Sequence, residues 1–458
     1  MKTIAFIETR SPQSNIFRRF PIPRVGAVLL STLLRQKGYE VKTFIEDIRK
    51  PDWSFIERSD LLCISTITST AHMAYETADR ARKIGIPVVM GGAHPTFMAG
   101  EALQHANFVI RGEGETALLQ LVESLKSGTP ALGSIKSLSY RDKAGNDVHN
   151  PQGEFVADLD SLPDPDYGLV HGWRNSNIHP IATSRGCAFN CRFCLVSPMF
   201  GRRYRFRSVE RVVEELRRIS AVSRSPLFFV DDNFAANKKR TKDILRHMIA
   251  DGIKPRWSGM VRPDIYRDEE LLRLLADCGK FTASIGFEST SAEALKAYNK
   301  HQKVDDNVRC VTALKALGIK IHGMFVFGSD ADTVETIRES AEFSINSGLD
   351  SVQFMILTPL PGTALYEDFK ATQRLLHTDW SKYDINHVVY KTAMIKPQHL
   401  QVEPIKAMER FYSWEHFLSH MKSLDLFYAA FGLYSKRMVK KALKDTKDYV
   451  DYLKQLDQ

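Results

Sequence analysis

The sequence has no hydrophobic run long enough to cross a bilayer. Its longest apolar stretches, such as residues 25–34, fall far short of the ~20 residues that a spanning helix needs. Cysteine is also scarce, with 6 in 458 residues. This usage excludes a disulfide scaffold and indicates a reducing compartment. Because a charged residue, Glu8, comes too early for a secretion signal, we expect a cytoplasmic protein.

The charge balance selects no partner by itself. The 63 basic and 54 acidic side chains leave a net charge of +9, which could suit nucleic acid, phosphorylated substrates or a membrane surface. The excess is modest, and we predict no nucleic-acid partner. Hydrophobic content of 43% and charged content of 26% are typical of a globular protein, and the length suggests about three domains at ~150 residues each.

Residues 1–135 alternate short apolar segments with amphipathic ones. The expected strands are residues 3–7, 40–44, 61–65, 88–90 and 108–110, and the expected helices are residues 25–36, 71–83 and 116–127. Such alternation predicts a doubly wound, Rossmann-like domain with a mostly parallel sheet. Sheets of this kind bind ligands beyond the carboxyl ends of their strands.

Small and polar residues follow three of these strands. They form the stretches Ser65-Thr66-Ile67-Thr68, Gly91-Gly92 and Arg111-Gly112-Glu113-Gly114-Glu115. Paired glycines let a backbone approach a bulky flat or phosphorylated ligand, because they carry no side chain. Doubly wound sheets also have glycine turns where no ligand binds, so the pattern alone leaves a structural role equally open.

Residues 136–178 predict a linker. Residues 138–146 read as a small hairpin with Gly145 in its turn, and residues 158–167 are too rich in proline and aspartate for a regular element. We therefore expect four parts, which are residues 1–135, the linker 136–178, a second α/β domain at 179–385 and a helical extension at 386–458.

The second α/β domain repeats the strand–helix unit six times. The expected strands are residues 179–184, 227–231, 256–261, 281–287, 320–327 and 351–357, and the expected helices are residues 209–219, 241–250, 268–277, 305–317 and 334–347. Units of ~30 residues suit a partial (βα)6 barrel of TIM type, with its active site at the carboxyl ends of the strands. Asp232, Arg262 and Glu288 fall at those ends.

Cys187, Cys191 and Cys194 follow the first of these strands in the spacing Cys-x3-Cys-x2-Cys. Thiolates at this spacing can converge on one soft metal centre. A structural zinc site requires four protein ligands, and no fourth cysteine or histidine lies nearby in the sequence. An iron–sulfur cluster tolerates the shortage if its fourth iron binds something else. A zinc or disulfide loop is the alternative. We expect the remaining cysteines, Cys63, Cys278 and Cys310, to be buried and structural.

With Phe193 before its last cysteine, the triplet resembles the signature of the radical SAM superfamily. The resemblance implies a 4Fe-4S cluster on the three cysteines, with S-adenosylmethionine (SAM) on the open iron and reductive cleavage to a 5'-deoxyadenosyl radical. Residues 230–234, 285–289 and 358–363 are similar to motifs of the class B members. By that likeness Phe193 and three strand-end residues contact SAM, with Asp232 at its ammonium, Arg262 at its carboxylate and Glu288 at its ribose.

The first domain resembles the cobalamin-binding domain of the same class. Ser65-Thr66-Ile67 stands where the family has Ser-x-Leu, and Gly91-Gly92 stands at its Gly-Gly, so both are implied to line the nucleotide tail of cobalamin. We add Gly112 and Glu113 to the predicted contacts. The Asp-x-His-x-x-Gly motif of classical cobalamin domains is absent, since the chain reads Glu8-Thr9-Arg10-Ser11 there. Many radical SAM relatives that lack this motif hold cobalamin without a histidine ligand, and some members with this domain bind no cobalamin, so the resemblance leaves both cases open.

The extension at 386–458 interleaves aromatic and basic residues. The aromatic ones are Phe411, Tyr412, Trp414, Phe417, Phe427, Tyr428, Phe431 and Tyr434, and the basic ones are Lys422, Lys436, Arg437, Lys440, Lys441 and Lys444. Such helices lie on an anionic membrane or cap an apolar channel. The spacing of the aromatic residues favours a cap packed on the barrel.

The resemblance implies an oxygen-sensitive class B radical SAM enzyme. We predict a cobalamin-dependent methyltransferase that acts on an unactivated carbon of an apolar small molecule, such as a lipid or a tetrapyrrole. It would need an external one-electron donor of the flavodoxin or ferredoxin type, because the cofactors carry the redox chemistry. The alternatives are a radical SAM enzyme that cyclises, couples or rearranges its substrate, and a non-enzymatic cobalamin or iron–sulfur module.

Overall fold

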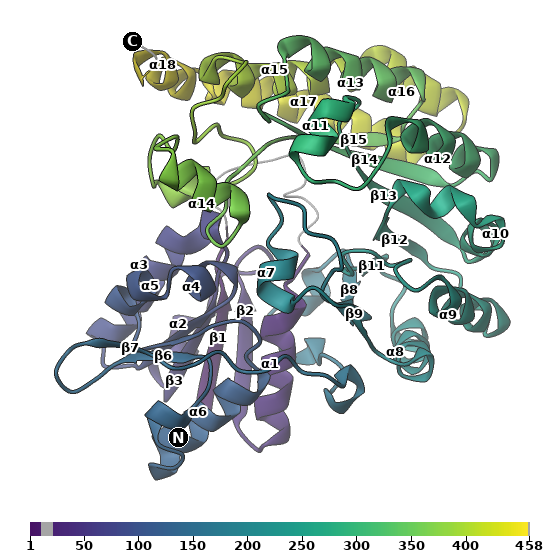
Figure 1. Ribbon diagram of the computed structural model, residues 1–458. Helices are drawn as coiled ribbons and strands as arrows, with labels where there is room; N and C mark the ends of the chain where they lie inside the picture. The colour runs from purple at the N-terminus through teal and green to yellow at the C-terminus, as the bar shows by residue number, and fades with distance from the viewer. Residues whose placement is uncertain (11–21, 457–458) are drawn as a thin grey trace.

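The computed structural model describes residues 1–10 and 22–456. It consists of a doubly wound N-terminal domain, an open barrel and a helical C-terminal layer (Figure 1). The predicted fold class is confirmed. Ser11, in the stretch that departs from the classical cobalamin motif, lies outside the described residues.

The first sheet has seven strands in the order β2-β1-β3-β4-β5-β6-β7. The strands are β1 (Thr3–Glu8), β2 (Glu40–Ile45), β3 (Leu61–Ser65), β4 (Val88–Gly91), β5 (Phe108–Ile110), β6 (Leu138–Arg141) and β7 (Asp147–His149). Those from β1 to β5 run parallel, and β6 and β7 pair antiparallel. The chain changes direction across the sheet between β1 and β3. Their carboxyl ends therefore form the crevice in which sheets of this kind bind ligands.

Helices cover both faces of this sheet (Figure 1). They are α1 (Val25–Gln36), α2 (Trp53–Glu57), α3 (Ala71–Lys83), α4 (Ala93–Phe97), α5 (Ala99–His105) and α6 (Glu115–Ser127). Alternate side chains of β1 enter different cores, because successive residues of a strand point to opposite faces. Ala5 and Ile7 pack in the core that includes α3 and α5, whereas Ile4 and Phe6 pack in the core that includes α1 and α6.

The hairpin expected in the linker forms as β6 and β7 and extends the first sheet. Its strand β6 pairs with β5 in a register that sets Phe108 opposite Tyr140. The rest of the linker contains only short 3-10 turns, at Leu159–Ser161, Tyr167–Leu169 and Trp173–Asn175. The boundaries of the four predicted parts stay predictions.

The barrel sheet has six parallel strands in the order β15-β14-β13-β12-β11-β8 and does not close. The strands are β8 (His179–Ile181), β11 (Leu227–Phe229), β12 (Arg256–Val261), β13 (Lys280–Glu288), β14 (Lys320–Phe327) and β15 (Ser351–Ile356). Helices α8 (Val209–Val222), α9 (Lys238–Ala250), α10 (Glu269–Asp277), α11 (Ala292–Ala297), α12 (Val304–Ala316), α13 (Val334–Asn346) and α14 (Ala364–Ala371) alternate with them.

The segment expected as one strand at 179–184 divides in two. The first part is β8, and the second is β9 (Ser184–Arg185), which pairs antiparallel with β10 (Arg205–Phe206) outside the barrel sheet. A short helix, α7 (Val196–Phe200), lies between β9 and β10 in the chain. The cysteine triplet is therefore carried by the connection between β9 and β10, within a small hairpin outside the barrel sheet.

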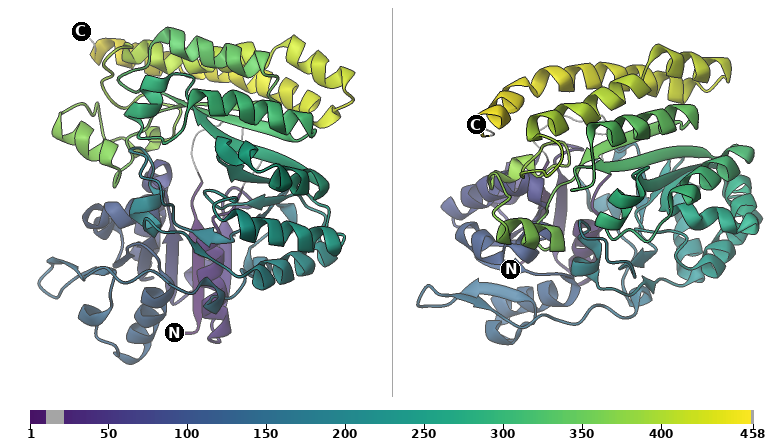
Figure 2. Two further views of the ribbon diagram at one scale, coloured as in Figure 1. Left: turned by 45° about the vertical axis from the view of Figure 1, so that its right-hand side comes forward. Right: turned by 45° about the horizontal axis from the view of Figure 1, so that its top comes forward.

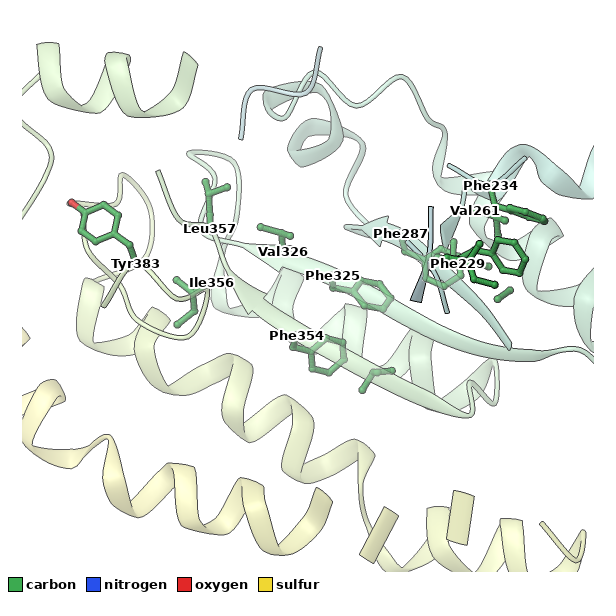
Figure 3. Close-up of a cluster of buried hydrophobic side chains, with 14 of the residues drawn as sticks. Phe229, Phe234, Val261, Phe287, Phe325, Val326, Phe354, Ile356, Leu357 and Tyr383 are labelled. Carbon is green, nitrogen blue, oxygen red and sulfur yellow. The ribbon is translucent and has the colours of Figure 1, made fainter. Parts of the chain in front are cut away.

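Aromatic side chains fill the barrel core (Figure 3). The ring centroids of Phe229 and Phe234 are 4.5 Å apart, and those of Phe325 and Phe354 are 5.3 Å apart. Each such pair adds about 0.5–1.5 kcal/mol beyond the apolar area it buries. This packing fixes the strands whose ends carry the predicted SAM contacts.

The C-terminal layer contains α15 (Pro397–Phe411), α16 (Trp414–Lys422), α17 (Leu426–Asp445) and α18 (Lys447–Leu456). Helix α15 packs on α13 and β15, and the layer extends across that edge of the barrel (Figure 2). The Tyr412 hydroxyl donates to the Val352 carbonyl (2.8 Å) and accepts from the Val352 amide (3.0 Å), so it satisfies two buried backbone groups of the edge strand β15. Among the described helices, none is both long and apolar enough to span a membrane.

Candidate active site

The cysteine loop begins at a glycine that no other residue can replace without movement. Gly186 has φ +84°, and a Cβ there would lie 2.3 Å from the Arg203 carbonyl oxygen. The following cysteines, Cys187, Cys191 and Cys194, are free and half-buried. The other three cysteines are free and buried in the core, as predicted.

The three thiols of the loop suit a metal centre that keeps one coordination position for a ligand other than a protein side chain. Burial raises the pKa of Cys191, and it raises the pKa of Cys194 to about 12. Binding to iron would withdraw these protons, because a coordinated sulfur is a thiolate. Three sulfur donors fit a 4Fe-4S cluster with one open iron, whereas a structural zinc site takes four ligands.

Two residues that the sequence did not single out support this loop. The Tyr204 hydroxyl lies 3.3 Å from the Cys187 sulfur, and the Ser197 hydroxyl donates to the carbonyls of Cys187 (3.1 Å) and Phe189 (2.6 Å). Tyr204 reaches the sulfur because it directly precedes β10, which pairs with the strand that leads into the loop. A two-residue strand leaves no pattern in a sequence, so no signal marked this tyrosine.

The two adjacent aspartates after β11 have different roles. The Asp231 carboxylate accepts hydrogen bonds from the Thr183 amide (3.1 Å), the Thr183 hydroxyl (3.1 Å) and the Ser184 hydroxyl, so it fixes the start of the cysteine loop. Burial, with the Asp231 charge second, raises the pKa of Asp232 to about 7. The Asp232 charge also acts on the Cys194 thiol. Asp232 is thus the aspartate placed to meet a ligand beside the cluster loop.

Arg262 and Glu288 approach the same loop from the neighbouring strands. The Arg262 guanidinium lies 3.8 Å from the centre of the Phe189 ring, and its Nη2 donates to the His301 carbonyl at 2.5 Å. Glu288 has φ +61° beside an irregularity in the pairing of β13 with β14. Such bulges redirect side chains near active sites. The Lys300 ammonium, which the sequence did not single out, binds the Glu288 carboxylate at 2.6 Å.

The predicted SAM contacts therefore gather around the cysteines. Arg262 and Glu288 both exert charge effects on Cys191, and Phe193 packs edge-on against the Tyr298 ring at 5.4 Å. This set offers a carboxylate for an ammonium, a guanidinium for a carboxylate and an acceptor for ribose hydroxyls. Their contacts with SAM stay predictions.

Four of the predicted cobalamin contacts, Ser65, Thr66, Gly91 and Gly92, lie together at the carboxyl ends of the paired strands β3 and β4, beside the crevice between β1 and β3. The Thr66 amide donates to the Gly91 carbonyl at 3.0 Å, and Arg24 donates to the Ser65 carbonyl at 3.2 Å. Gly92 has φ +101°, and a Cβ there would lie 2.4 Å from the Thr66 carbonyl oxygen. The close approach of the two loops therefore requires a glycine at position 92.

Gly112 and Glu113 lie at the end of β5. The Gly112 amide donates to the Thr96 hydroxyl at 2.9 Å. The Glu113 carboxylate lies 3.0 Å from Arg185 and 2.7 Å from Arg205, and it is almost fully buried. Burial would raise the pKa of Glu113, but the two arginines outweigh it and lower that pKa. Glu113 thus binds the hairpin that carries the cysteine loop, and a contact with cobalamin stays a prediction.

The fold and the site together define a class of protein. It combines a barrel domain that can hold an iron–sulfur cluster with a doubly wound domain of the cobalamin-binding type. Two family models match the chain, the radical SAM superfamily over residues 181–344 and the B12 binding domain over residues 18–122. The chain belongs to the family of radical SAM enzymes that carry a B12-binding domain. The predicted cofactor set, a 4Fe-4S cluster, SAM and cobalamin, is confirmed at the level of this family.

Three curated relatives align with most of this chain. An uncharacterized methyltransferase of Pyrococcus horikoshii is 31% identical over 85% of this chain and 88% of its own length. Bacteriochlorophyllide d C-12(1)-methyltransferase of Chlorobaculum tepidum is 28% identical over 80% and 78%. Anaerobic magnesium-protoporphyrin IX monomethyl ester cyclase of Cereibacter sphaeroides is 29% identical over 74% and 57%.

A solved structure shares the whole fold. The radical SAM methyltransferase TsrM from Kitasatospora setae, with cobalamin and a 4Fe-4S cluster bound, superposes with a TM-score of 0.73. The match covers 97% of this chain and 100% of TsrM at 18% identity.

Proposed function

We propose that this enzyme is a cobalamin-dependent methyltransferase that acts on an unactivated carbon of an apolar small molecule. One observation carries the proposal. Arg185, two residues before Cys187, pairs with Glu113 (3.0 Å) and Glu115 (2.6 Å) at the start of α6. A buried contact therefore ties the cysteine loop to the end of a strand of the cobalamin-type sheet. A substrate bound between them would be open to both cofactors.

The chain's own residues would bind and orient the reacting groups. The three loop cysteines would hold the cluster, while Asp232, Arg262 and Glu288 would orient SAM. Ser65, Thr66, Gly91 and Gly92 would receive the cobalamin tail. When bound, these cofactors supply an electron for SAM cleavage and a carrier for the methyl group. The protein contributes position and the exclusion of water.

The relatives support an apolar substrate. One is named for a bacteriochlorophyllide and another for a porphyrin ester, and both of these molecules are tetrapyrroles. A tetrapyrrole is therefore the first substrate class to test, and hopanoids are the second, because a hopanoid C-2 methylase is also similar to this chain.

The test uses SAM that carries a trideuteromethyl group. Anaerobically reconstituted, cobalamin-loaded enzyme is incubated with a reductant and tetrapyrrole or hopanoid acceptors. We expect an acceptor in which one trideuteromethyl group replaces a carbon-bound hydrogen, and no such product from the Cys187→Ala variant. Turnover of acceptor without incorporation of the label would reject methyl transfer.

The second candidate is a cyclisation, coupling or rearrangement that transfers no methyl group. The similarity to a cyclase favours it. In the same experiment it predicts 5'-deoxyadenosine and an acceptor that has lost hydrogen or been rearranged, with no deuterium gained.

We also propose that the C-terminal layer touches a membrane surface. We predicted that the aromatic residues of this layer pack against the barrel as a cap. This is confirmed for part of them, since Phe411, Tyr412, Tyr428 and Phe431 are buried. However, α16, α17 and the loop between them expose an apolar patch of six residues, Trp414, Leu418, Met421, Leu424, Leu426 and Phe427. Exposed apolar clusters of this kind mark interaction sites, and the lysines of α17 would suit anionic headgroups.

Vesicle sedimentation tests the membrane contact. We expect the protein to pellet with vesicles containing phosphatidylglycerol and the Leu424→Asp/Phe427→Asp variant to stay in the supernatant. Equal pelleting of the two proteins would reject this patch as the contact.

A further inference from the structure

The cysteine loop lies against one short surface segment. The Arg192 amide donates to the Tyr298 carbonyl at 3.1 Å, and the Asn299 side chain donates to the Asn190 carbonyl at 2.8 Å. The Phe189 and His301 rings are 6.4 Å apart. The segment from Tyr298 to His301 is therefore in direct contact with the chain that carries Cys191.

Residues of this segment also line a basic hollow of about 510 Å³. Its lining includes Lys296, Lys300, His301 and Lys303, with Asp305 as the single acid among the lining residues. Lys296, His301 and Lys303 are exposed. Lys300 points inward to Glu288, whereas Lys296 and Lys303 form no ion pair with any described residue. We call this cavity, with its lining side chains Lys296, Lys300, His301 and Lys303, the basic hollow.

We propose that the basic hollow is the docking surface for an acidic one-electron donor protein of the flavodoxin or ferredoxin type. The proposal rests on the proposed function only in requiring an electron from outside the chain. Electron tunnelling slows steeply with distance, so a donor must dock where the cysteine loop is near the surface. The hollow meets this condition, because three residues that line it or adjoin its lining, Tyr298, Asn299 and His301, touch residues 189–192.

Charge and size agree with such a donor. Electron-transfer encounters bury small areas and exchange quickly, so attraction between opposite charges sets most of their association rate. Unpaired lysines on the hollow provide that attraction to an acidic protein without the cost of breaking existing ion pairs. In the docking step the donor loses one electron and the enzyme gains one, and no bond forms or breaks.

The experiment compares two reductants on the same reconstituted holoenzyme. The Lys296→Glu/Lys303→Glu variant is reduced either by photoreduced flavodoxin at low ionic strength or by dithionite, which needs no docking. We expect the flavodoxin-driven rate of cluster reduction, followed by absorbance, to fall at least ten-fold. The dithionite-driven rate should not change. Added salt should slow the unsubstituted enzyme with flavodoxin, because it screens the attraction.

The matched control reverses the charge of two lysines in another part of the protein. Lys440 and Lys444 are exposed on α17 in the C-terminal layer (Figure 1), so Lys440→Glu/Lys444→Glu makes the same charge change and should leave both rates unaltered. An unchanged flavodoxin rate in the Lys296/Lys303 variant would overturn the proposal. Slowing by both reductants would also overturn it, since the lysines would then serve the site itself. Absence of methyl transfer does not affect this readout.

Discussion

At the scale of the residue, the cobalamin-type crevice depends on the missing side chain of Gly92. Its φ of +101° is costly for any residue with a Cβ, by about 1–2 kcal/mol. In addition, the Cβ would meet the Thr66 backbone at 2.4 Å, so the crevice itself would have to move.

We therefore expect Gly92→Ala to lose cobalamin selectively. Cobalt bound per chain, measured by elemental analysis after reconstitution, should fall several-fold while iron stays constant. Gly85→Ala is the matched control, because Gly85 has φ +83° but open space around it. Equal cobalt in the two variants would show that Gly92 does not shape the binding site.

Candidate site residues that belong to short sequence motifs could be predicted from the sequence. Residues that approach the site only in the folded chain could not. The spacing of three cysteines is a local signal. The sequence does not show locally which of Asp231 and Asp232 faces a ligand. The hydroxyls that donate hydrogen bonds to Asp231 lie 47 and 48 positions earlier in the chain. Tyr204 was missed because it meets Cys187 through the pairing of β9 with β10, and Lys300 because the connection from β13 to α12 folds back onto Glu288.

At the scale of the element, the docking of α16 depends on a half-buried histidine. His416 Nε2 donates to the Asp350 carbonyl at 3.1 Å, and its ring packs 4.8 Å from Phe411. Burial, with the nearby His420 second, lowers the pKa of His416 to about 4. The folded protein therefore binds fewer protons at this site than the unfolded chain between pH 6.5 and 4. Stability from this site falls as the pH falls through that window.

We expect acidification to weaken the folded protein through His416. Between pH 7 and pH 5 the loss from this group is about 2 kcal/mol in the free energy of unfolding. Urea titrations at the two pH values should show a smaller loss for His416→Gln than for the unsubstituted protein. The exposed His399→Gln serves as the control and should behave as the unsubstituted protein does. An identical loss in His416→Gln would contradict this account.

Elements were predictable from the sequence where they were long and periodic. The helices from α8 to α10 and the barrel strands lie close to their expected positions, because their apolar residues repeat at the helical or strand period. The pair β9 and β10 was not predicted, since two residues show no period. The pairing of β6 with β5 was also missed, because a hairpin's sequence does not say which sheet edge it joins.

At the scale of the whole molecule, a buried ion-pair cluster joins the two α/β domains. Glu113 and Glu115 of the first domain meet Arg185 and Arg205 of the cysteine-loop hairpin. Removal of one partner from a buried pair leaves an uncompensated charge and costs about 3–5 kcal/mol.

We expect Glu113→Ala to weaken the contact between the domains more than either domain itself. Thermal unfolding of the variant should separate into two transitions. In the unsubstituted protein the two transitions should lie closer together in temperature. The control is Glu123→Ala, which removes an exposed pair with Lys126 (3.9 Å) and should cost less than about 1 kcal/mol. Coincident transitions in Glu113→Ala would contradict a joining role for this cluster.

The central claim is that Cys187, Cys191 and Cys194 hold a cluster whose open iron presents SAM for reductive cleavage. The most direct measurement is 5'-deoxyadenosine formed by anaerobically reconstituted protein with SAM and dithionite. We predict about four irons per chain and 5'-deoxyadenosine from the unsubstituted protein and from Cys310→Ala, and neither from the triple alanine variant of the loop cysteines. Undiminished 5'-deoxyadenosine from that triple variant would contradict the claim.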